Sequence, residues 1–217
     1  MSLPELDLQI VYGRLAWAVV FATVVYALWP AAWRRSRAVL PGILVGATVV
    51  MALPGAASPA HWLGLAFQWP SGVLLGYCLA WLYARWQGRP RDICLPLGLA
   101  LPLVLAGAAL YADAIGWIAQ GFYYWGFGPY AAPALGLLIA LACAVALVRG
   151  QGRAAAFAVL FATALFALLR LPTGNLWDAL LDPLLWMWAV GSVAVVLGRR
   201  RRRPTGGAAV AKQRIRY

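Results

Sequence analysis

Seven long apolar runs, each bounded by arginine, proline or glycine, constrain this chain more than any other feature of its sequence. A bilayer core about 30 Å thick needs roughly 20 apolar residues per helix, and these runs approach that length. They are continuous and lack the period-two alternation of membrane β-strands. The sequence therefore predicts an all-α, polytopic membrane helix bundle, with spans at residues 9–29, 38–54, 65–84, 93–112, 129–148, 154–171 and 179–198.

Composition supports a lipid-facing surface. Hydrophobic residues make up 64% of the 217 residues and charged residues only 11%, whereas soluble domains average about a quarter charged. The net charge of +12 would be compatible with nucleic-acid binding, because basic stretches commonly bind nucleic acid. Here the charge lies in short connections and in the C-terminal tail, which is the distribution of a topology signal. We therefore expect no nucleic-acid partner.

The basic residues fall on every second connection between the runs. All except Arg14 and Arg170 follow the first, third, fifth or seventh run. Positive residues resist translocation and stay in the cytoplasm, so the pattern predicts seven spans, an outside N-terminus and a cytoplasmic C-terminus in a bacterial inner membrane. The predicted cytoplasmic residues are Arg34, Arg35, Arg37, Arg85, Arg89, Arg91, Arg149, Arg153, Arg199–Arg203, Lys212, Arg214 and Arg216.

Two regions follow from this pattern: a transmembrane domain at residues 1–198 and a basic cytoplasmic tail at residues 199–217. We expect the tail, and Arg199–Arg203 in particular, to attract anionic lipid, since each charge near such a surface contributes about 1 kcal/mol. Membrane lipids are thus the first expected partners.

Three cysteines and two glycine pairs lie inside the apolar runs. The cysteines form no CxxC pair, and we predict free thiols at Cys78, Cys94 and Cys143. Gly42 with Gly46, and Gly72 with Gly76, place small residues on one face of a helix. That spacing permits close helix packing but is common in apolar helices.

The predicted outer connections are apolar and aromatic, and residues 113–128 are the densest in large rings. A solvated loop of that composition would expose them at about 1.5–3 kcal/mol for each large side chain. We therefore predict an ordered surface helix of two or three turns, or a re-entrant element. Two interpretations remain open: an interfacial aromatic belt, or a platform that binds a partner protein or a lipid-linked sugar through Trp117, Tyr123, Tyr124 and Trp125.

Charged residues near the predicted outer boundary form a second candidate site. Asp178 and Asp182 lie four residues apart and share a face if the segment is helical, and Arg170 ends the preceding run. Ionisable residues at membrane depth often mark a substrate or ion pocket. The structural alternative is that Asp182 caps a helix that begins at Pro183, while Arg170 neutralises one of the acids.

His61 is the single histidine of the chain, and it completes the tentative outer pocket. One histidine excludes a bis-histidine haem and a three-histidine zinc site within this chain. A role for His61 as a general base would require a partner within reach. A polar surface residue is the alternative interpretation.

No motif indicates a cofactor or a reaction. The sequence contains no GxxxxGK[ST], HExxH or GxSxG pattern. A retinal protein would need a lysine in its last span, whereas the only lysine is Lys212 in the tail. We therefore expect no cofactor and no metal.

Three functions remain as hypotheses. The first is a non-catalytic subunit or accessory protein of the bacterial cell envelope, which binds a membrane partner protein through its aromatic outer connections. The second is a small transporter or flippase for a lipid-linked or anionic substrate, with Arg170, Asp178 and Asp182 in its pathway. The third is an enzyme that acts on a membrane-embedded substrate through His61 and the outer acids.

Overall fold

In the computed structural model, the described residues are 3–30, 32, 36, 38–89, 92–150 and 152–201, with side chains up to Arg199. The basic residues Arg34, Arg35, Arg37 and Arg91 lie outside this part of the chain. So does the tail beyond Arg201, and with it most of the predicted lipid-binding stretch.

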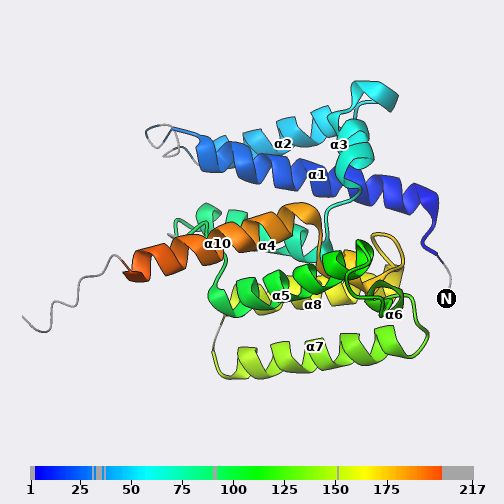
Figure 1. Ribbon diagram of the computed structural model, residues 1–217. Coiled ribbons are helices and arrows are strands. Elements are labelled where there is room, and N and C mark those ends of the chain that lie inside the picture. Colours follow the sequence, from blue (N-terminus) through cyan, green and yellow to red (C-terminus); the bar gives the residue numbers. More distant parts are fainter. Residues whose placement is uncertain are drawn as a thin grey trace, which may run out of the picture.

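The regular secondary structure of the described residues is entirely helical, with no strand, which confirms the all-α part of the predicted fold class. Seven longer helices run roughly parallel or antiparallel to one another, and the short helices gather at the end of the bundle where the chain begins (Figure 1). The longer helices are α1 (Leu6–Leu28), α2 (Val39–Met51), α4 (Gly72–Trp86), α5 (Leu97–Ala114), α7 (Ala131–Val148), α8 (Arg153–Leu169) and α10 (Pro183–Arg201). The short ones are η2 (Gly55–Ala57), α3 (Pro59–Phe67), α6 (Phe122–Trp125) and α9 (Leu176–Leu180).

Three of the helices, α1, α5 and α7, are long and apolar enough to cross a membrane. The helices α2, α8 and α10 are also apolar but shorter over their apolar length. Large apolar side chains remain exposed along α7, among them Leu137, Leu138 and Leu141. A surface of this kind associates with lipid, because water would solvate it poorly.

Two of the predicted spans are interrupted by breaks in the helix. The run at 65–84 is split after Phe67, where Gln68 adopts a positive φ of 61° and α4 begins only after Ser71. The Ser71 hydroxyl caps this start by accepting the Leu74 N–H at 3.1 Å. The run at 179–198 likewise contains the end of α9 and a separate start of α10. An N-cap of this kind fixes where a helix begins even where the sequence stays apolar.

The closest helix contact joins α4 and α8 through one of the two glycine pairs. A Cβ atom added to Gly72 would lie 2.7 Å from the Cα of Ala162, and one added to Gly76 would lie 2.9 Å from the Cα of Ala158. Small residues let the two backbones approach, as in many membrane helix pairs. By contrast, a Cβ at Gly42 or Gly46 would meet nothing within 4 Å.

Tryptophan side chains join the other helices to this pair. Trp186 of α10 packs on Gly107 of α5, and its Nε1 donates to the Val104 carbonyl at 3.2 Å. Trp188, two residues farther along α10, meets the ring of Tyr77 on α4 edge-on at 5.5 Å. The α5–α10 pair is thereby fixed against α4, with buried Leu185 and Ala189 on the shared face.

We predict that Gly76→Leu will destabilise the protein, whereas Gly46→Leu will not. Overpacking a close contact costs about 1–3 kcal/mol, which for a chain of this size lowers the thermal midpoint by at least about 2 °C. The measurement is thermal unfolding in detergent for both variants. Equal midpoints for the two variants would mean that the α4–α8 contact is not tightly packed.

Candidate functional site

The end of the bundle that holds α3, α6 and α9 is called the aromatic end below, after Trp117, Trp125 and Trp177. Asp182 occupies its centre and is only 7% exposed. One carboxylate oxygen accepts the Leu185 N–H at 2.8 Å and thereby caps α10, which begins at Pro183. The helix-capping interpretation of the sequence is thus confirmed.

The second oxygen of Asp182 makes a contact that the sequence did not indicate. It accepts the backbone N–H of Ser71 at 2.8 Å, at the point where α4 begins. A single buried carboxylate therefore joins the starts of α4 and α10. Both helices direct the positive ends of their dipoles toward it, and helix starts favour an acidic side chain at this position.

Asp178 is also held by hydrogen bonds. The Tyr123 hydroxyl donates to its carboxylate at 3.0 Å, and the Thr173 hydroxyl donates to the same oxygen. Burial raises the pKa of the Asp178 carboxyl, although these two hydroxyls act in the opposite direction. Burial and the charge of Asp178 also raise the pKa of Tyr123 to about 12, so Tyr123 keeps its proton and remains a donor at neutral pH.

The aromatic segment, residues 113–128, is ordered but less helical than predicted. Its helix α6 has only four residues instead of two or three turns. The glycines around it break the helix, and Gly121 adopts a positive φ of 66°. In place of hydrogen bonds within a longer helix, the Asp113 carboxylate accepts the backbone N–H groups of Gln120 at 3.1 Å and Gly121 at 2.9 Å.

The region around α9 fixes the same segment from the other side. Asn175 donates from its amide to the Tyr123 carbonyl at 3.2 Å, and Trp177 donates from its indole to the Phe122 carbonyl at 2.9 Å. The backbone of α9 adds a bond from the Leu176 N–H to the Gly126 carbonyl at 3.1 Å. A Cβ at Gly126 would overlap the Asn175 amide, so glycine is required there.

This fixed backbone displays large rings on its outer side. Trp117 is 83% exposed and Tyr124 is 74% exposed, whereas Tyr123 is turned partly inward toward Asp178. The exposure of Trp125 lies between those of Tyr123 and Tyr124, and its ring contacts Phe122 edge-on at 5.1 Å. Of the four residues predicted to bind a partner or lipid, Trp117 and Tyr124 are therefore the most accessible.

A small cavity of about 320 Å³ lies beneath this surface. Asp178 and Asp182 both contribute to its wall, as the sequence pattern suggested, but from the separate elements α9 and the α9–α10 junction. Aromatic rings and apolar side chains form most of the rest. The other lining residues are Ala66, Phe67, Gln68, Leu110, Tyr111, Tyr123, Trp177, Leu181 and Pro183.

Arg170 and His61 do not join the acids. Arg170 ends α8 in a left-handed conformation, and its guanidinium lies over the Phe166 ring at 4.9 Å. Among the described residues it forms no ion pair with Asp178 or Asp182. His61 is exposed on α3, edge-on to Trp62 at 5.4 Å, and does not line the cavity.

Sequence reasoning did not identify three polar residues that organise this end: Asp113, Thr173 and Asn175. A signal was present for Asn175, because an asparagine before an apolar stretch is a typical helix N-cap, and it accepts the Trp177 N–H at 2.9 Å. The three cysteines are free, as predicted. Within the described part of the chain, no cluster of His, Cys, Asp or Glu side chains could hold a metal ion.

We predict that Asp182→Asn will lower the free energy of unfolding by about 1–3 kcal/mol, because the amide NH₂ would face a backbone N–H and leave it without an acceptor. The matched control is Asp92→Asn, which removes the same charge from an exposed ion pair with Arg199. Such pairs contribute at most about 1 kcal/mol. Thermal unfolding of both variants checks this, and a smaller loss for Asp182→Asn than for the control would contradict it.

Comparison of the chain with protein-family models, with curated proteins and with solved structures gave no match. Function must therefore be inferred from the geometry of the site. That geometry consists of two hydrogen-bonded carboxylates, a small cavity and an exposed aromatic surface whose backbone is hydrogen-bonded to neighbouring elements.

Proposed function

We propose that this protein is a non-catalytic, seven-span subunit or accessory protein of the bacterial inner membrane, which binds a partner protein of the cell envelope through its aromatic end. The N-terminus lies outside and the C-terminus lies in the cytoplasm. The observation that carries the proposal is the aromatic segment, whose exposed rings stand on a backbone fixed by side chains of α5 and the α9 region.

Fixation of the backbone distinguishes a binding surface from an interfacial belt. A belt needs only that Trp and Tyr reach headgroup depth, whereas a binding surface gains affinity when its residues are ordered before the partner arrives. Aromatic side chains are also the commonest anchors of protein interfaces. Trp117 and Tyr124 combine both properties, since they are exposed and flank a segment held by Asp113.

The seven-span topology is supported by the arrangement of the longer helices. Successive long helices run in opposite directions (Figure 1), and the described arginines Arg85, Arg89, Arg149, Arg153 and Arg199 sit at helix termini away from the aromatic end. The helices α2 and α4 are shorter than a typical span. Flanking residues such as those of α3 then complete the crossing, or the bilayer thins locally.

A second candidate function is transport, and one observation favours it: two carboxylates line the same cavity. With Arg170 turned away, the charged groups there are negative, which suits a cationic or hydroxyl-rich substrate instead of the anionic one expected from the sequence. Asp182, however, is fully engaged with Ser71 and Leu185. No observation specifically favours the enzyme hypothesis, because His61 lies outside the cavity.

The topology predicts a simple labelling pattern. In a background without the native cysteines, Trp117→Cys and Tyr124→Cys should react with a membrane-impermeant maleimide in intact spheroplasts. Arg89→Cys and Arg149→Cys, which are also exposed in the structure, should react only after the membrane is permeabilised. Labelling of all four variants from one side would refute the alternating topology.

The partner hypothesis predicts a specific crosslink. A photoreactive residue at Trp117 or Tyr124 should give one discrete protein adduct in native membranes, while the same residue at lipid-facing Leu138 of α7 should give lipid adducts only. Asp113→Ala should reduce the adduct because it releases the backbone of Gly121. If the two aromatic positions also give only lipid adducts, the aromatic end is an interfacial belt.

A further inference from the structure

A second and larger cavity lies at the opposite end of the bundle, called the basic end below after Arg89, Arg153 and Arg199. It has a volume of about 1080 Å³ and opens between α4, the first turn of α8, residues 92–97 and α10. This volume lies at the upper end of the range for small-molecule sites. Nothing in the sequence pattern indicated it, because its walls come from four separate segments.

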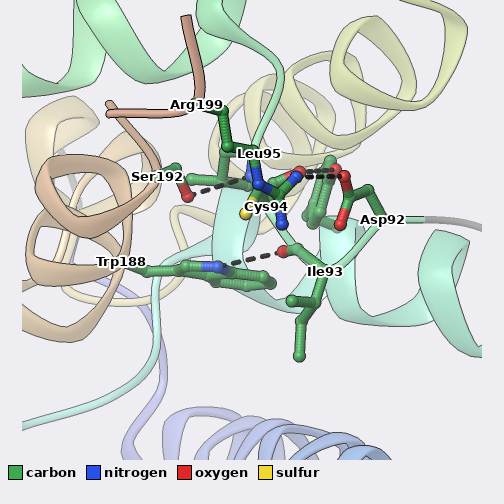
Figure 2. A network of polar contacts seen from close by, with 8 residues as sticks. Asp92, Ile93, Cys94, Leu95, Trp188, Ser192 and Arg199 are labelled. Carbon is green, nitrogen blue, oxygen red and sulfur yellow. Dashed lines mark hydrogen bonds and ion pairs between the residues drawn. The ribbon is translucent and has the colours of Figure 1, made fainter. Parts of the chain in front are cut away.

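The stretch that contributes Asp92, Cys94 and Leu95 to the lining is hydrogen-bonded to α10 (Figure 2). The Ser192 hydroxyl accepts the Leu95 N–H at 3.0 Å, and the Trp188 indole donates to the Ile93 carbonyl at 3.1 Å. Leu95 and Ser192 are almost completely buried. Two hydrogen bonds therefore hold the residues before α5, part of the cavity boundary, against α10.

The charge of the described lining residues is positive. Asp92 is the acid of the lining, and it is paired with Arg199 at 3.1 Å (Figure 2). Arg89 and Arg153 also line the cavity, and no described carboxylate neutralises either of them. The positive charge of this lining therefore favours an anionic ligand.

The start of α8 adds to this preference. Arg153 is its first residue, it follows Gly152, and its first turn contains neither an acid nor a side-chain cap. A cation at the positive end of a helix dipole is unfavourable, and an anion between the two would remove that repulsion. This helix start supports the charge of the cavity but would not define a site alone.

The remaining wall is apolar and reaches the lipid-facing surface. Leu79 and Ala80 of α4, Leu97 of α5 and Val196 of α10 line it, and half-exposed Phe157 of α8 stands at its edge. A free phosphate or a soluble phosphate ester would make no use of such a wall. An acyl chain would cover it, while a charged headgroup would meet the arginines.

We propose that the basic-end cavity binds an anionic phospholipid, with its phosphate at Arg89 and Arg153 and an acyl chain along Leu79, Leu97 and Phe157. This site is distinct from the general attraction of the C-terminal arginines for anionic lipid. It is also independent of the function proposed for the aromatic end.

The test uses the full-length protein in detergent, and native mass spectrometry measures lipid binding. Phosphatidylglycerol should bind in preference to phosphatidylcholine with the same acyl chains. The double variant Arg89→Gln, Arg153→Gln should weaken phosphatidylglycerol binding by about tenfold or more. The matched control, Arg14→Gln with Arg170→Gln, removes the same charge from the other end and should change little. All variants keep the C-terminal tail.

A steric variant and a second ligand separate the site from nonspecific attraction. Ala84→Trp fills the cavity without a change in charge and should also weaken phosphatidylglycerol binding. Inorganic phosphate should not displace the lipid at millimolar concentration. The proposal is overturned if both lipids bind equally, if the double variant binds like its control, or if inorganic phosphate displaces the lipid. Should Ala84→Trp fail to fold, the charge variants alone decide.

Discussion

The structure depends on one buried carboxylate at the aromatic end. Asp182 holds the first turn of α10 and the start of α4 together, through the N–H groups of Leu185 and Ser71. Water competes for backbone groups at an ordinary surface, but near lipid each unpaired group costs several kcal/mol. A chain that breaks its helices at Gln68 and Leu181 therefore needs fixed partners at these breaks, and Asp182 supplies two bonds at once.

Helix α1 supplies hydrogen-bond donors to backbone carbonyl groups in the irregular segments of this end. Its side chains Gln9, Tyr12 and Trp17 donate to the carbonyls of Pro172, Pro70 and Gln68, at 2.7, 2.7 and 3.2 Å. These polar groups within an apolar helix are thus structural. They also join the irregular stretches around Gln68, Pro70 and Pro172 to helix α1.

Properties that are local in sequence could be predicted, and properties that depend on tertiary contacts could not. The apolar runs gave the approximate positions of the long helices, and the Asp182–Pro183 pair gave the start of α10. The bond from Ser71 to Asp182 crosses 111 residues and leaves no local pattern. Arg170 was expected beside the acids, but its left-handed backbone directs the guanidinium onto Phe166. The basic-end cavity could likewise not be predicted from the sequence, because its lining comes from four separate segments.

The two ends of the bundle differ in whether their charged side chains are bonded to other groups of the protein. At the aromatic end, three carboxylates accept hydrogen bonds from N–H and O–H groups of the protein itself: those of Asp113, Asp178 and Asp182. The exposed part of residues 113–128 is aromatic, so the recognition proposed there would depend mainly on shape and apolar contact. At the basic end, Arg89 and Arg153 line a cavity and form no ion pair with a described carboxylate, so the anion binding proposed there would weaken as ionic strength rises. Salt would therefore distinguish the two proposed binding modes, because ionic screening weakens contacts to charged groups more than contacts between apolar rings.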